Sequence, residues 1–110
     1  MSPKLAIPPE VRAEVERKIA EFNRKHLRGR AAYTARFRGR YVYVGREVAY
    51  DSPAPIFRLT YNGAMDNWDF AIYKYTSERY DPDEWFFPGA GKVDGTVEGA
   101  LQAGLMAYPI

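Results

Sequence analysis

The strongest constraint on the fold is an alternation of apolar and polar residues on both sides of the dipeptide Gly39-Arg40. Residues 31–38 and 41–44 alternate with a period of two, which is typical of β-strands with one buried face. A two-residue loop that begins with glycine connects antiparallel strands tightly, so the segment predicts a β-hairpin. The loop fixes three opposed pairs, which are Arg38 with Tyr41, Phe37 with Val42, and Arg36 with Tyr43.

This register sorts the hairpin side chains onto two faces, because directly opposed residues share a face. One face is apolar and is expected to meet the core: Ala35, Phe37, Val42 and Val44. The other face carries guanidinium and phenol groups: Arg36, Arg38, Tyr41 and Tyr43.

Two further strands are predicted at residues 56–61 and 68–75, separated by a turn at residues 62–67. Their inward residues are apolar or aromatic: Phe57, Leu59, Tyr61, Trp68, Phe70 and Ile72. Their outward residues extend the polar hairpin face: Arg58, Thr60, Asp69, Tyr73 and Tyr75. The sequence therefore predicts a four-stranded antiparallel meander.

A helix is predicted at each end of the sheet. Residues 8–27 start at two prolines, carry apolar residues at steps of three and four, and stop at Gly29. On this helix Glu14 with Lys18 and Glu21 with Lys25 have the spacing of ion pairs.

The second helix follows Thr96, a good N-cap, and its small residues, which include Gly104, predict close packing on the sheet. Residues 76–95 are predicted to form a long packed loop, and a short strand or a turn of helix within it is left open.

These elements predict a two-layer α+β domain with both helices on one sheet face. The length of 110 residues fits a single domain over residues 1–110, in which residues 1–7 are expected to form a flexible N-terminal tail. The outer face of the sheet would then meet water or a partner.

Composition excludes several kinds of site. The chain has no cysteine, so it has no disulfide, no thiol nucleophile and no cysteine-ligated zinc or iron–sulfur centre. No apolar run approaches the roughly 18 residues that span a bilayer. No stretch near the N-terminus is apolar enough for a signal peptide, so we expect a cytoplasmic protein without a membrane partner.

Charge is distributed unevenly along the chain. Residues 1–46 hold 12 basic and four acidic residues, a net charge of +8, whereas residues 47–110 have a net charge of −6. Such asymmetry marks either a surface for an anionic partner or two halves that neutralise each other in the folded protein. The total of +2 favours neutralisation, so nucleic acid is a possible but not a favoured partner.

Motifs for catalysis or cofactors are absent or incomplete. Gly89-Ala90-Gly91-Lys92 is no phosphate loop, because Phe86 stands where a glycine is required and Val93 where a serine or threonine is required. A weaker anion site remains at Lys92 and the backbone amides near residues 95–96. His26, at a helix end, suits the helix dipole. We predict no catalytic residue, metal or cofactor.

The outer sheet face is the candidate binding site. Aromatic rings on a sheet can stack nucleobases, and arginine can neutralise phosphate. The same residues would also suit a protein interface or a homodimer, or form a solvated face stiffened by Arg–Tyr contacts. The candidate binding residues are Arg36, Arg38, Tyr41, Tyr43, Arg58, Tyr73 and Tyr75.

Four segments, at residues 36–43, 68–75, 79–89 and 94–100, carry a resemblance to known proteins. The chain resembles a family of short bacterial hypothetical proteins with no assigned activity. The resemblance implies a bacterial origin and one small domain, and it implies no reaction, cofactor or catalytic residue.

We therefore predict a small non-enzymatic binding or interaction module that uses its Arg/Tyr-rich sheet face for an anionic or protein partner. One alternative is a small enzyme that uses the acidic and glycine-rich loop at residues 78–96, with Asp81, Asp83, Glu84 and Lys92 as acids, bases and charge stabilisers. Another is a structural accessory protein with no ligand site.

Overall fold

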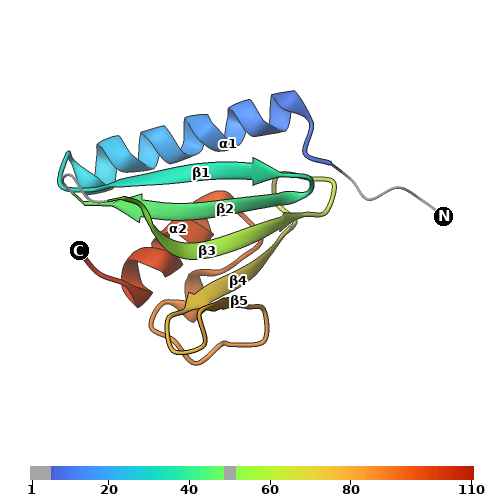
Figure 1. Cartoon of the computed structure of the whole chain (residues 1–110). Helices are drawn as coiled ribbons and strands as arrows, with labels where there is room; N and C mark the ends of the chain where they lie inside the picture. Colours follow the sequence, from blue (N-terminus) through green and yellow to red (C-terminus); the bar gives the residue numbers. More distant parts are fainter. Residues whose placement is uncertain (1–5, 49–51) are drawn as a thin grey trace.

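The computed structural model describes residues 6–48 and 52–110 (Figure 1). Two helices and one antiparallel sheet confirm the predicted α+β class, with the helices on one sheet face. The elements follow in the order α1 (Pro9–Phe22), η1 (Asn23–Leu27), β1 (Ala32–Arg38), β2 (Tyr41–Glu47), β3 (Ala54–Tyr61), β4 (Trp68–Lys74), β5 (Arg79–Asp81), η2 (Ala90–Lys92) and α2 (Val97–Ala107).

The strands pair in sequence order, β1-β2-β3-β4-β5, and every neighbouring pair is antiparallel. In the hairpin of β1 and β2, Arg38 lies opposite Tyr41, Phe37 opposite Val42 and Arg36 opposite Tyr43. The predicted register is therefore confirmed, and it places the arginines and tyrosines on the face away from the helices.

The prediction of four strands is wrong by one, because β5 pairs with β4 inside the segment predicted as a loop. Tyr80 lies opposite Tyr73 in this pairing. Glu78 turns the chain with a left-handed φ of 51°, between the end of β4 at Lys74 and the start of β5. A three-residue strand between charged residues carries too little alternation to be recognised in the sequence.

The core lies between the sheet and the two helices. Buried side chains of α1 and α2 meet those of β2, β3 and β4: Val15, Ile19, Phe22, Val97, Leu101, Val42, Val44, Phe57, Leu59, Phe70 and Ile72. The prediction of a flexible tail over residues 1–7 is wrong at Ile7. This residue is buried in the core, and its N–H donates to the Gly39 carbonyl.

The first helix is fastened to the sheet at its C-terminal end. The π-helical turn η1 ends at Arg28 and Gly29, both with positive φ, so the helix stops where the sequence predicted. The Asn23 side chain accepts a hydrogen bond from the Tyr33 N–H at 2.9 Å and donates to the Tyr33 carbonyl at 3.1 Å. These bonds satisfy backbone groups on the free edge of β1, which a neighbouring strand would otherwise satisfy.

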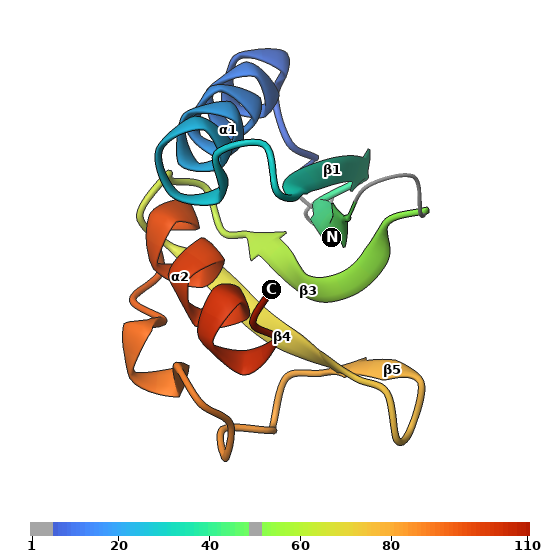
Figure 2. The same cartoon turned by 90° about the vertical axis from the view of Figure 1, so that its left-hand side faces the viewer.

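The sheet is strongly curved, and its outer face is concave. Ile56 has no partner in the pairing of β3 with β2, because Val44 lies opposite Phe57 and Gly45 opposite Pro55. Such a bulge bends the strand and increases its twist. In Figure 2 both helices lie on the left of the sheet, while β5 and the start of β3 extend toward the other side.

No helix in the described parts of the chain is both long enough and apolar enough to cross a membrane.

Candidate functional site

A chain of aromatic rings crosses the outer face of the sheet. Among the described residues, six tyrosines contact one another in the order Tyr41, Tyr43, Tyr80, Tyr73, Tyr75 and Tyr108. The distances between successive ring centroids are 6.1, 5.4, 4.9, 4.9 and 5.4 Å. Most of these pairs meet edge to face, which is a favoured arrangement for aromatic rings.

The contact between Tyr43 and Tyr80 shows how far the sheet curves. Tyr43 lies on β2 and Tyr80 on β5, so β3 and β4 lie between them. In a flat sheet three strand spacings would separate their backbones by about 14 Å, yet the ring centroids are 5.4 Å apart. Ala71, on the same face of β4, is small enough for the rings to close over it and is itself buried.

Two arginines lie against these rings. The Arg58 guanidinium is 5.0 Å from the Tyr41 ring centroid and 5.8 Å from that of Tyr80. The Arg36 guanidinium is 5.3 Å from the Tyr43 ring. These are cation–π distances, and they hold the planar guanidinium groups at defined places on the face.

The charge of these arginines is not neutralised by the described part of the chain. Within it, no carboxylate forms an ion pair with Arg36, Arg38 or Arg58. Among the described residues, the Nε atom of Arg58 is buried and has no hydrogen-bond acceptor. A buried donor without an acceptor is uncommon in proteins and costs stability.

The ion pairs of the described residues lie elsewhere. Glu21 binds Lys25 as predicted, but Glu14 binds Arg17, and Lys18 reaches Glu98 on α2 instead of Glu14. In the loop predicted as a possible partner of the hairpin, the carboxylates bind nearby cations: Glu84 binds Lys74 and Asp81 binds Arg79. Within the described residues, the acidic half of the chain therefore forms no ion pair with the arginines of the sheet face.

The concave face contains two neighbouring hollows of about 400 Å³ each. The first, which we call the proline hollow, is lined by Thr34, Ala35, Arg36, Tyr43, Gly45, Pro53, Pro55, Tyr73 and Tyr80. The second, which we call the hairpin hollow, is lined by Ala6, Arg38, Gly39, Arg40, Tyr41 and Tyr43. Tyr43 borders both hollows, so together they form an interrupted groove across the sheet.

The structure brings most of the predicted binding residues together on this face: Arg36, Tyr41, Tyr43, Arg58 and Tyr73. Arg38 lies at the end of β1 and lines the hairpin hollow. Tyr75 lies beyond the end of β4, where its hydroxyl donates to the Pro55 carbonyl at 2.7 Å and its ring contacts Tyr108.

Sequence reasoning missed Tyr80, which completes the groove. Its only sequence signal is the three-residue alternation Arg79-Tyr80-Asp81 after a polar turn, which is too short to predict a strand or its pairing with β4. Burial raises the pKa of the Tyr80 phenol, although Arg36 and Arg58 act in the opposite direction. The phenol is therefore neutral at physiological pH and does not cancel the arginine charges.

The acidic loop does not assemble an acid–base pair. Glu84 accepts hydrogen bonds from Lys74 Nζ at 2.8 Å and from the Phe86 N–H at 2.8 Å, and these bonds lower its pKa. Asp81 accepts from the Asp83 N–H at 3.0 Å. A hollow of about 310 Å³ joins Glu84 to β4, but the carboxylate there is already bound to Lys74. The side chains of Glu84 and Asp81 are thus both engaged by groups near them in the fold.

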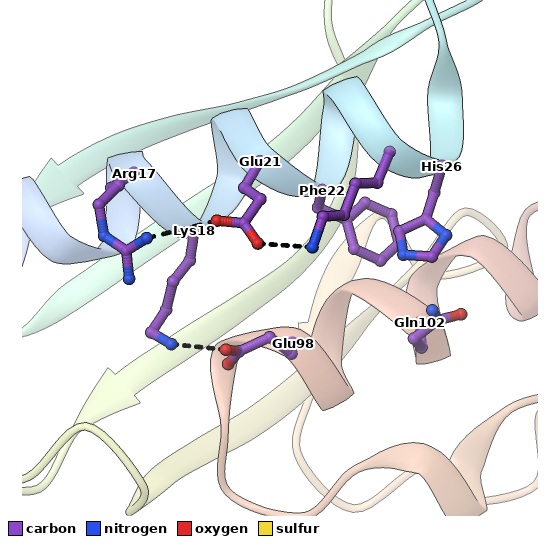
Figure 3. Close-up of a pocket in the computed structure, with 8 residues that line it drawn as sticks. Arg17, Lys18, Glu21, Phe22, His26, Glu98 and Gln102 are labelled. Carbon is purple, nitrogen blue, oxygen red and sulfur yellow. Dashed lines mark hydrogen bonds and ion pairs between the residues drawn. The ribbon is translucent and has the colours of Figure 1, made fainter.

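A fourth cavity, of about 270 Å³, lies between α1 and α2 (Figure 3). Its charged side chains bind one another: Glu21 contacts both Arg17 and Lys25, and Lys18 contacts Glu98. His26 lies against Phe22 with the ring centroids 4.5 Å apart. Because opposite charges alternate around this groove, it has little excess charge with which to hold an ion.

The weaker anion site expected at the start of α2 is occupied by a side chain of the protein. Thr96 caps the helix by accepting from the Gly99 N–H at 3.0 Å, as predicted. Asp94 Oδ1 accepts from the Thr96 N–H at 3.0 Å and from the Thr96 hydroxyl at 2.6 Å. The carboxylate already provides the negative charge that this helix end favours.

Asp94→Asn is expected to lower the melting temperature at neutral pH, and the difference from wild type should vanish in acid. The hydrogen bonds from Thr96 lower the pKa of Asp94 below its ordinary value of 3.8. A lowered pKa stabilises the fold above the ordinary value, and this stabilisation is lost as pH falls through the lowered value. Thermal unfolding across a pH series measures this. Glu16→Gln, on the exposed face of α1, is the control and should keep the melting temperature of the wild type at neutral pH.

In the described ranges, no three His, Asp or Glu side chains lie close enough together to hold a metal ion. Comparisons with protein families, with curated proteins and with solved structures found no match to the chain. The resemblance to short bacterial proteins therefore stays a prediction.

Proposed function

We propose that the protein is a small non-enzymatic binding module that takes an anionic ligand on its concave sheet face. The observation that carries the proposal is the pair Arg36 and Arg58, which lie against tyrosine rings and have no carboxylate partner in the described chain. Both belong to the group of residues that the sequence predicted for binding.

The geometry supports an anion for two reasons. Rings on both sides of Arg58 displace water from the guanidinium, and a charge with less water around it attracts an anion more strongly. Stacking on a ring uses the flat face of a guanidinium and leaves its N–H groups free at the edge, where they can donate paired hydrogen bonds to phosphate or carboxylate.

The test is a titration of the protein with inorganic polyphosphate at low salt, in which isothermal titration calorimetry measures the affinity. The double variant Arg36→Gln, Arg58→Gln is expected to bind at least about tenfold more weakly, since one hydrogen bond to a charged group contributes about 1.5–3 kcal/mol. Raising the salt concentration should also weaken binding by the wild type.

The matched control is Arg24→Gln, Lys25→Gln, which removes the same charge from the end of the first helix, in the other layer of the fold. It should bind like the wild type. Absence of binding at low salt, or an equal loss in both double variants, would contradict an anion site on the concave face.

A further inference from the structure

We infer that the anionic ligand is a single-stranded nucleic acid, whose bases stack on the tyrosine rings while its phosphates meet the arginines. This inference rests on the proposed function and specifies its ligand. Two features support it that the binding of a small anion such as phosphate would not require. They are the connected aromatic surface and the presence of two similar hollows, the proline hollow and the hairpin hollow.

The aromatic surface exceeds what anion binding requires. Tyr41, Tyr43, Tyr73 and Tyr80 are each partly exposed, and their rings form one connected surface. Single-stranded nucleic acids are bound by such surfaces in combination with basic residues, because every base has a π-face that can stack.

The groove repeats the same combination of groups. The proline hollow offers Arg36 beside Tyr43 and Tyr73, and the hairpin hollow offers Arg38 beside Tyr41 and Tyr43. Arg36 and Arg38 are two residues apart on β1, so their backbones are about 7 Å apart along the strand. A ligand that presents a planar group and a negative charge in each repeating unit would fill both hollows.

The shape of the face favours unpaired bases. In a duplex the bases are stacked inside the helix and cannot reach rings at the bottom of a concave surface, whereas unpaired bases can turn outward and stack on aromatic side chains. Each hollow has a volume of about 400 Å³, which is within the size range of small-molecule sites. An acidic peptide would satisfy the arginines but would make little use of the aromatic surface.

The experiment compares four probes by competition in fluorescence anisotropy: oligothymidylate, an abasic strand with the same number of phosphates, a duplex of equal length, and oligoglutamate. We expect oligothymidylate to bind at least about tenfold more tightly than the abasic strand, because stacking of one base contributes about 1–3 kcal/mol. The duplex should bind about as weakly as the abasic strand.

Variants separate stacking from charge. Tyr43→Leu should remove most of the difference in affinity between oligothymidylate and the abasic strand, and Tyr43→Phe should restore that difference. Phe86→Leu is the control, because Phe86 is fully exposed and lines neither hollow.

Equal affinity for oligothymidylate and the abasic strand would overturn the nucleic-acid inference and leave the anion-binding proposal standing. Equal or tighter binding of oligoglutamate would also overturn it and would indicate an acidic protein partner. Failure of all four probes to bind would overturn both proposals.

Discussion

Replacing Phe57 with alanine is expected to lower the free energy of unfolding by about 3–5 kcal/mol. Phe57 is fully buried at the centre of the sheet. Its ring centroid lies 5.2 Å from that of Phe70, on which it stacks, and 6.2 Å from that of Tyr33. Truncation removes these contacts and leaves a cavity that the surrounding side chains cannot fill completely. A domain of this size is stabilised by only about 5–15 kcal/mol, so the loss is a large part of the total.

Urea unfolding followed by circular dichroism measures the change. Phe86→Ala is the matched control, since it makes the same replacement at a position whose side chain is fully exposed. Its free energy of unfolding should stay within about 0.5 kcal/mol of the wild type. If the two variants lost similar stability, the packing of Phe57 between the sheet and the helices would be wrong.

Replacing Gly104 with valine is expected to cost about 1–3 kcal/mol, because the helix α2 touches the sheet at this residue. A Cβ atom at Gly104 would lie 2.8 Å from Ile56 Cγ2 and 2.9 Å from the Tyr33 hydroxyl oxygen. That hydroxyl donates to the Leu101 carbonyl at 2.9 Å and is buried, so it cannot move aside without losing its hydrogen bond.

Gly91→Val provides the comparison for Gly104, because a Cβ atom at Gly91 would meet no atom within 4 Å. Urea unfolding should show a clear loss for Gly104→Val and a much smaller one for Gly91→Val. A Gly104 variant as stable as the wild type would mean that α2 lies farther from β3 than the structure places it.

The hairpin could be predicted from sequence in detail because its information is local. The two-residue loop at Gly39-Arg40 fixes the pairing of every residue in β1 with one in β2. Burial of Val42 and Val44 then sends Arg36 and Tyr43 to the other face. The close approach of α2 to the sheet at Gly104 could also be predicted locally, because small residues in a helix allow close packing.

The curvature of the sheet could not be predicted, because it depends on contacts between distant residues. The local sequence does not predict the β-bulge at Ile56, where β3 pairs with β2. It also does not predict that the three residues of β5 pair with β4 as a fifth strand. Without these two features Tyr80 would not lie against Tyr43, and the face would be an open sheet surface without a groove. The ion pairs of Lys18 and Glu14 were also mispredicted, since Glu98 reaches Lys18 from the other end of the chain.

The short strand β5 makes the groove depend on a marginal part of the fold. Three residues pair it to β4, and within residues 6–48 and 52–110 no strand lies beside its other edge. Short edge segments of this kind open locally at a much lower free energy than the core, and each such opening carries Tyr80 away from Tyr43. Under the proposed function, only molecules with β5 docked have a complete site, so the expected affinity is the intrinsic affinity reduced by the docked fraction. Substitutions that strengthen the β4–β5 turn should therefore tighten the proposed binding without touching the ligand.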